Sequence, residues 1–261
     1  MDQKGILLYC ITNKLDDKIC EIIGMDKANH LYSMEQSGLY AIVSDVSLEE
    51  YGEDAMKDKA EDIEWLKEKA VIFMEVILKI NSLCSIIPMK FLTIFTSDER
   101  VKGVITENYE KFLHNFDKID NREELSLKIY CDDKQYKDKV MAEEIKKFEQ
   151  SIIGKPKGAA FFLKKKFDGE LDDKIQNRIC GVANQVAEKI NSLAVEVKTN
   201  KLLAKEITGI STQMILNCAY LVDNEKELQI SERIEELKGD YESSGFIIEL
   251  SGPWPPFSFC E

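Results

Sequence analysis

The chain has 261 residues, of which 44% are hydrophobic and 32% are charged, a composition typical of a globular protein with one large or two ordinary domains. Its formal net charge of −13 argues against nucleic acid as a partner, because a nucleic-acid-binding face must be basic. No apolar stretch approaches the roughly 18 residues that suggest a membrane span, and the N-terminus lacks the features of a signal peptide. The seven cysteines are scattered without a C-x-x-C pair, so we expect free thiols in a reducing cytoplasm.

The chain opens with apolar runs of strand length. We predict strands at 5–12, 31–35 and 39–43, and the intervening Gln36, Ser37 and Gly38 are typical of a hairpin turn. From Met56 to Ile80 apolar residues recur at spacings of three and four, which predicts a single long helix.

The next apolar segment, residues 86–95, contains Pro88 and therefore reads as an edge strand or extended segment, since proline cannot donate a ladder hydrogen bond. Thr96 and Glu99 then have the spacing of a capping box. They open a second predicted helix, whose apolar stripe runs to Ile119.

The second half alternates strand and helix patterns. The predicted elements in chain order are strand 125–131, helix 137–152, strand 159–163, helix 172–192, strands 194–198 and 214–222, helix 225–238 and strand 246–250. Asn224 and Glu227 have capping-box spacing for the last helix, and the lysines at 164–166 read as the solvated end of a strand.

With residues 132–171 set aside as an insertion, this half has the order β-α-β-β-α-β of a ferredoxin-like fold. We therefore predict an α+β protein of two domains. Residues 1–121 form the first. Residues 122–261 form the second, a modified ferredoxin-like domain with an inserted helical segment and a proline-rich C-terminal segment.

No catalytic, cofactor-binding or metal site is predicted. The phosphate-binding glycine motifs, the nucleophile elbow and the H-E-x-x-H zinc motif are all missing from the sequence. The two histidines, His30 and His114, are isolated, and the acidic doublets lie where aspartate commonly caps a helix. Because catalysis needs matched groups within reach of one another, the sequence does not favour an enzyme.

The C-terminal segment combines prolines with aromatic residues. It consists of Gly252, Pro253, Trp254, Pro255, Pro256, Phe257, Ser258 and Phe259. The prolines restrict the backbone, so the aromatic side chains can be held in a fixed geometry at low entropic cost. Three interpretations remain open: the aromatic residues pack on their own protein and close a core, they dock on a partner, or the prolines form a P-x-x-P ligand.

This segment, GPWPPFSF, resembles the C-terminal signature of the GvpF/GvpL family of gas vesicle proteins. A second segment, IPMKFLTIF at 87–95, which contains Pro88, Phe91, Thr93 and Phe95, is similar to another family segment. Shorter matches follow the family order at 38–46, 158–164 and 219–222. The chain departs from the pattern at three positions. Leu92 stands where the family has glycine, Phe73 lies near a common histidine, and Phe257 replaces tyrosine.

The resemblance implies two α+β domains, the second a modified ferredoxin fold, and a non-enzymatic accessory or minor structural role in gas vesicle assembly. It further implies a cytoplasmic protein, associated with the vesicle and not inserted in a membrane, that binds the hydrophobic main shell protein GvpA and other accessory proteins. Such a binder would use its net charge to keep the shell protein soluble or to aid nucleation. No cofactor is implied. The alternative is a generic α+β ligand-binding or regulatory module.

Overall fold

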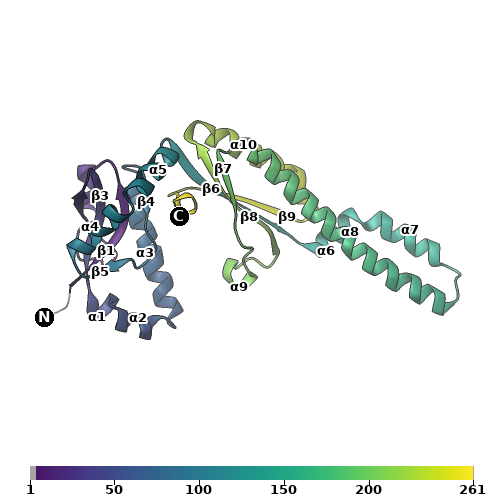
Figure 1. The fold of residues 1–261 in the computed structure, drawn as a ribbon. Helices are drawn as coiled ribbons and strands as arrows, with labels where there is room; N and C mark the ends of the chain where they lie inside the picture. Colours follow the sequence, from purple (N-terminus) through teal and green to yellow (C-terminus); the bar gives the residue numbers. More distant parts are fainter. Residues whose placement is uncertain (1–3, 261) are drawn as a thin grey trace. The chain divides into compact units, whose positions relative to one another are not determined.

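The computed structural model describes residues 4–260, and the chain divides into two compact units of mixed α/β structure (Figure 1). The first unit contains the chain up to Glu124 together with the residues from Pro253 onward, and the second contains Leu125–Gly252. The predicted division therefore differs from the observed one at the C-terminus, where residues 253–260 belong to the first unit. They do so because they pack on its helices and hydrogen-bond to them, as described below.

The first unit is built around a five-stranded sheet of order β2-β3-β1-β4, in which β5 also pairs with β1 and all the described pairings are antiparallel. Its elements are β1 (Lys4–Thr12), η1 (Asp17–Glu21), β2 (Tyr32–Gln36), β3 (Leu39–Ser47), α1 (Leu48–Tyr51), α2 (Glu53–Lys59), α3 (Ile63–Asn81), β4 (Ile86–Pro88), β5 (Ile94–Phe95), α4 (Asp98–Glu107), α5 (Tyr109–Ile119) and η4 (Phe257–Phe259). Pro88 lies on the edge strand β4, as predicted.

Helices cover both faces of this sheet, so the central strand β1 is buried from Gly5 to Thr12. One hydrophobic cluster joins β1 to α3, and a second joins β1 to α4 and α5. The pairing of β1 with β3 jumps from Leu8 opposite Val43 to Cys10 opposite Ile42. This β-bulge lets the consecutive residues Tyr9 and Cys10 both join the α3 cluster, which strict alternation would forbid.

The predicted hairpin is confirmed, and its turn has a clear backbone reason. Ser37 and Gly38 both have positive φ, 55° and 82°, as a two-residue hairpin turn that matches the strand twist requires. The Glu35 side chain accepts a hydrogen bond from the Gly38 N–H at 2.8 Å, which fixes the turn further.

The prediction of one long helix over 56–80 was wrong, because the structure has α2 and α3 with a break between them. Asp62 causes the break by capping α3: its Oδ1 accepts from the Trp65 N–H at 3.0 Å. The second predicted helix is likewise divided into α4 and α5 at Asn108. It is capped by Ser97, which accepts from the Arg100 N–H at 3.4 Å, and not by Thr96.

Because of Tyr9, the stability of this core depends on pH in the alkaline range. Its hydroxyl oxygen accepts from the Met25 N–H at 2.7 Å and lies 3.0 Å from Ser44 Oγ. Burial raises the pKa of Tyr9 from 10.0 to about 12. Its stabilising contribution is therefore complete below pH 10 and is lost as the pH rises towards 12, because the unfolded state releases this proton first.

We expect the free energy of unfolding to fall between pH 10 and pH 12 more steeply in the wild type than in Tyr9→Phe, by up to about 1.4 kcal/mol per pH unit. Urea unfolding followed by circular dichroism across this range measures the difference. Equal slopes in the two proteins would contradict it.

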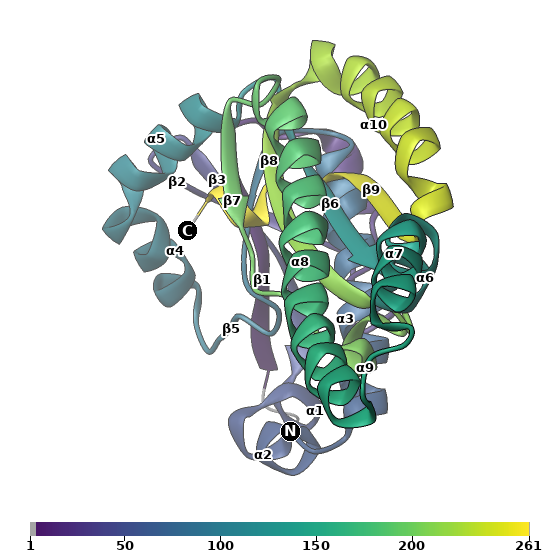
Figure 2. The ribbon, with the colours of Figure 1, turned by 90° about the vertical axis from the view of Figure 1, so that its right-hand side faces the viewer.

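The second unit has a four-stranded sheet of order β7-β8-β6-β9. Its elements are β6 (Arg122–Cys131), which begins in the first unit, α6 (Asp133–Val140), α7 (Ala142–Ile152), α8 (Lys157–Asn191), β7 (Glu196–Thr199), α9 (Lys205–Thr208), β8 (Gln213–Asp223), η2 (Asn224–Lys226), α10 (Glu227–Tyr241), η3 (Glu242–Ser244) and β9 (Phe246–Trp254). Alternate β6 residues, Leu125, Leu127 and Ile129, join one core cluster with residues of α8 and α10. Figure 2 shows the α8 helix alongside the strands of this sheet. None of the helices within residues 4–260 is long and apolar enough to cross a membrane.

The strand predicted at 159–163 was wrong, because these residues lie in α8. A short apolar run does not by itself distinguish a strand from a helix. The helix begins after Pro156, whose fixed φ suits a helix start. The helix predicted at 137–152 is also divided, at Met141, into α6 and α7.

The helix predicted at 172–192 is only the C-terminal part of α8, which begins 15 residues earlier at Lys157. The other strand and helix predictions for this half are confirmed to within a few residues, and β9 continues to Trp254. The capping box predicted at Asn224 was wrong, since the η2 turn precedes α10 and no side chain caps that helix. The chain order is β6, then the helices α6 to α8, then β7, the short helix α9, β8, α10 and β9.

Candidate functional site

The C-terminal segment lies against the first unit, held by the carboxylate of Glu124. Glu124 Oε2 accepts from the Ser258 N–H at 2.8 Å, and Oε1 accepts from the Ser258 hydroxyl at 2.6 Å. Glu124 is itself buried, so these hydrogen bonds form largely out of water, where charge-assisted bonds are strong.

Helix α5 holds the next two residues by their backbone carbonyls. The Asn115 side-chain amide donates to the Cys260 carbonyl at 3.1 Å, and the Lys118 ammonium donates to the Phe259 carbonyl at 3.2 Å. The same ammonium lies 5.5 Å from the centre of the Phe259 ring, within reach of a cation–π interaction. Phe259 is only 1% exposed, so this aromatic residue has a structural position inside the first unit.

The prolines of the segment differ in exposure. Pro253 is exposed, whereas Pro255 and Pro256 are buried. A P-x-x-P ligand must present its prolines to an aromatic groove on a partner, so the burial of two of them argues against that interpretation. Trp254 is half-buried, and Gly252, with a φ of 132°, lies within β9.

The second family segment forms a loop anchored on β1. The Met89 N–H donates to the Tyr9 carbonyl at 2.8 Å, and the Leu8 N–H donates to the Thr93 carbonyl at 2.9 Å. Between them the chain reverses in a turn in which the Thr93 N–H and hydroxyl both donate to the Lys90 carbonyl, at 3.2 and 2.7 Å. Leu92, the third residue of this turn, has a φ of 61°, a conformation in which a turn ordinarily uses glycine.

Leu92 supplies a test of backbone strain. At most sites alanine is more stable than glycine, but at positive φ the order reverses. We expect Leu92→Gly to exceed Leu92→Ala in free energy of unfolding by about 1 kcal/mol, because glycine removes the left-handed penalty and both variants lose the same side-chain packing. Chemical denaturation of the two variants measures the difference, and a more stable alanine variant would show that the turn is unstrained.

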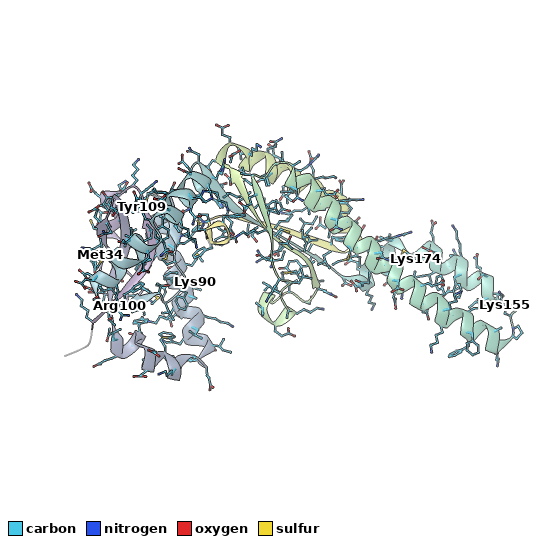
Figure 3. All side chains as sticks on the ribbon, in the orientation of Figure 1. Met34, Lys90, Arg100, Tyr109, Lys155 and Lys174 are labelled. Carbon is cyan, nitrogen blue, oxygen red and sulfur yellow. The ribbon has the colours of Figure 1, made fainter. Side chains whose placement is uncertain are left out.

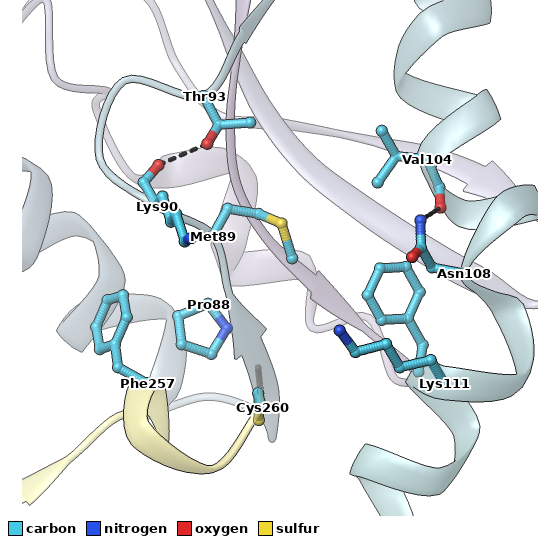
Figure 4. Close-up of a pocket in the computed structure, with 10 residues that line it drawn as sticks. Pro88, Met89, Lys90, Thr93, Val104, Asn108, Lys111, Phe257 and Cys260 are labelled. Carbon is cyan, nitrogen blue, oxygen red and sulfur yellow. Dashed lines mark hydrogen bonds between the residues drawn. The ribbon is translucent and has the colours of Figure 1, made fainter.

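A pocket of about 460 Å³ opens between this loop, the C-terminal segment and the helices α4 and α5, all within the first unit (Figure 4). Its lining residues are Pro88, Met89, Lys90, Thr93, Val104, Asn108, Lys111, Phe112, Phe257 and Cys260. Figure 4 shows Phe257 beside Pro88, and the ammonium end of Lys111 reaching across the pocket from α5.

The pocket combines an apolar wall with two cations. Lys90 and Lys111 are exposed, and neither has an ion-pair partner among residues 4–260. Asn108 uses its amide N–H to donate to the Val104 carbonyl at 2.9 Å, which leaves the amide oxygen available to a ligand. The arrangement can therefore accept an apolar group that carries an acidic function beside it.

No histidine or carboxylate lines the pocket, and its ionisable side chains are those of Lys90, Lys111 and Cys260. Elsewhere in the described part of the chain, no group of three or more histidine, cysteine or acidic residues is arranged to hold a metal ion.

Three of the residues singled out from sequence line the pocket together: Pro88, Thr93 and Phe257. The others lie elsewhere. Phe91 packs edge-on against Phe73 at 5.5 Å between ring centres, and Phe95 joins the α4 and α5 cluster.

Sequence reasoning missed the helical half of the pocket. Val104, Asn108, Lys111 and Phe112 were read only as parts of a helix, and the spacing of Asn108 and Lys111, three residues apart, was the sole signal that they share a face. The anchoring role of Glu124 had no signal in the sequence.

A sequence model of the family described as gas vesicle synthesis protein GvpL/GvpF matches residues 5–261. The chain belongs to the GvpL/GvpF family. It is 24% identical over 265 residues to gas vesicle protein L1 of Halobacterium salinarum, a match covering 98% of this chain and 90% of the relative. Gas vesicle protein L of a Streptomyces species is 21% identical over 228 residues, covering 87% of this chain and 82% of the relative.

Among solved structures, the crystal structure of the gas vesicle protein GvpF from Anabaena has the same fold. Its TM-score is 0.75 at 18% identity, covering 99% of this chain and 98% of that chain. The resemblance inferred from the sequence segments is thereby confirmed, and the chain is a GvpL/GvpF protein of gas vesicle formation with two antiparallel sheets.

The structure also gives physical meaning to the positions where this GvpL/GvpF protein departs from the family pattern. Leu92, which stands where the resemblance expects glycine, has a positive φ of 61°. Phe73 stacks on Tyr9 with ring centres 5.5 Å apart, so it packs in the core. Phe257 lines the pocket with a ring that lacks the tyrosine hydroxyl, which makes this wall of the pocket fully apolar.

Proposed function

We propose that this GvpL/GvpF protein is a non-enzymatic accessory or minor structural component of gas vesicle assembly that binds the main shell protein, GvpA. The observation that carries the proposal is the pocket in the first unit, which two family segments far apart in sequence build together. Its apolar wall and its two lysines suit protein binding, and its lining contains no histidine or carboxylate.

The physical role follows from the contrast between the two proteins. A very hydrophobic shell subunit buries little apolar surface until it is assembled, so it is prone to aggregate. A binder with a net charge of −13 keeps a complex soluble by repulsion between complexes. The pocket would hold an apolar side chain of the shell protein next to one of its carboxylates, before or during nucleation.

The same proposal covers the location of the protein, its need for a cofactor and the fold of its second domain. The protein acts in the cytoplasm and associates with the gas vesicle, where other accessory proteins are additional partners. It requires no cofactor. Its second domain is a modified ferredoxin-like fold, for which the support is the order β6, α8, β7, β8, α10, β9 with α6 and α7 inserted.

A second candidate function, a ligand-binding or regulatory module, is favoured by the size of the same pocket. A volume of about 460 Å³ lies in the range of small-molecule sites. A small molecule that copurifies with the chain and is displaced by pocket substitutions would support this function over shell-protein binding.

The test is co-expression of the shell protein with the full chain. We expect the shell protein to remain in the soluble fraction and to copurify, and the charge reversals Lys90→Glu and Lys111→Glu to reduce the recovered amount severalfold. Lys102→Glu is the matched control, because Lys102 is an exposed lysine of α4 outside the pocket. If the shell protein stays equally insoluble and no complex is recovered, the proposed function fails.

A further inference from the structure

The helical hairpin formed by α7 and α8 is well anchored at one end only. Near its base, Glu144 of α7 forms an ion pair with Lys174 of α8 at 2.7 Å, and Phe148 stacks on Phe167 with ring centres 3.8 Å apart. The first buried residue of α8 is Leu171. Before Leu171, Phe167 also packs against the core of the unit, whereas residues 157–166 of α8 do not belong to that cluster. In Figure 1 these first turns extend past the strands of the unit.

The free end of this hairpin, residues 153–166, is called the hairpin tip here. Four apolar side chains are exposed on it, and three of them strongly: Ile153 is 78% exposed, Phe161 66% and Phe162 73%, with Leu163 beside them. Single exposed apolar residues are ordinary, but a contiguous group of them marks an interaction site. The rings of Phe161 and Phe162 lie edge to face, with centres 6.0 Å apart, so they form one aromatic surface.

The hairpin tip is also basic in an acidic protein. It contains five lysines, Lys155, Lys157, Lys164, Lys165 and Lys166, and no acidic residue. Because the whole chain carries −13 and the tip +5, the remainder carries −18. Lys166 pairs with Glu170 at 3.7 Å, whereas the other four have no ion-pair partner among the described residues. Figure 3 shows Lys155 at the end of the hairpin and Lys174 further along α8.

We propose that the hairpin tip is a docking surface for a partner protein whose matching face is apolar and rimmed by carboxylates. Aromatic side chains would anchor the contact by burying large apolar areas, and the lysines would orient the partner and accelerate the encounter. Nucleic acid and anionic membranes present the negative charge but would be repelled by the −18 on the remainder of the chain. A partner protein, in contrast, can place its apolar and acidic residues opposite the tip alone. We identify this partner as the main shell protein, an identification that rests on the proposed function.

The experiment compares tip variants of the full chain, each co-expressed with the shell protein. Phe161→Ser with Phe162→Ser removes the aromatic surface, and Lys164→Glu with Lys165→Glu reverses the charge. The matched controls are Leu228→Ser, at a residue 75% exposed on α10, and Lys189→Glu near the end of α8. Thermal unfolding of every variant checks that the fold is intact. We expect it to be, because all the substituted residues are exposed.

We expect at least a tenfold decrease in the shell protein recovered with either tip variant and no change with the controls. Recovery with the wild type should also fall as salt is raised. If wild type and tip variants recover the shell protein equally, the inference is overturned while the proposed function stands. If the wild type recovers none, both are overturned.

Two further measurements test whether the hairpin tip binds a membrane or a second copy of the chain instead. If the wild type binds vesicles containing phosphatidylglycerol and the tip variants do not, the tip is a membrane contact and the proposal is overturned. Light scattering that shows a wild-type dimer and monomeric tip variants would assign the tip to self-association, which also overturns it.

Discussion

Replacing Phe259 with alanine is expected to lower the free energy of unfolding of the first unit by about 3–5 kcal/mol, the usual cost of truncating a buried phenylalanine. The ring is 1% exposed and is covered by the Lys118 side chain. Its removal would leave a cavity that the surrounding helix cannot fill, because α5 is fixed by its own packing on the sheet. Urea unfolding followed by circular dichroism measures the change.

The matched control for this prediction is Phe161→Ala. Phe161 is exposed, and substitutions at such positions ordinarily change stability by less than about 0.5 kcal/mol. A Phe259→Ala variant as stable as this control would mean that the C-terminal segment is held by its hydrogen bonds alone and that its aromatic residue is dispensable for folding.

Glu124 is expected to show the second large effect. Glu124→Ala removes the acceptors of both Ser258 hydrogen bonds and should cost about 2–4 kcal/mol, since a hydrogen bond to a charged group contributes about 1.5–3 kcal/mol. Glu124→Gln should cost less, because its amide oxygen still accepts one of the two bonds. The same unfolding assay ranks the three proteins.

A double-mutant cycle with Ser258→Ala separates this interaction from the other contacts of Glu124. We expect a coupling energy of about 1 kcal/mol or more between the two residues, within the range found for residues in contact. Because Ser258→Ala keeps the backbone N–H, additive effects would show that the Ser258 hydroxyl bond to Glu124 does not contribute to stability. Glu110→Ala, on the exposed face of α5, should leave stability unchanged.

Most of the strands could be predicted from sequence because their apolar residues lie in short runs bounded by turn residues, as at Ser37 and Gly38. The breaks between α2 and α3 and between α4 and α5 could not, since the apolar periodicity continues across them. They depend on which of several polar residues caps the next helix. At 159–163 the error had a different source: a short apolar run after a turn fits a strand and a helix equally well, and these residues lie in α8.

The pocket could not be predicted from the sequence, for a different reason. Pro88 and Phe257 were each singled out by sequence, but nothing along the chain indicates that they meet. Their contact depends on the return of the C-terminal segment to the first unit, after the whole of the second unit has been traversed. The lysines and helical residues that complete the pocket carry no local pattern that distinguishes them from solvated helix positions.

This return of residues 253–260 has a consequence for synthesis on the ribosome. The first unit is translated early, but it lacks the strap that fills its side until the second unit has been made. At about 5–20 residues per second, the delay is on the order of ten seconds. The nascent first unit therefore lacks this part of its structure during that time, and the complete pocket, which includes Phe257 and Cys260, exists only on chains whose translation has passed residue 260.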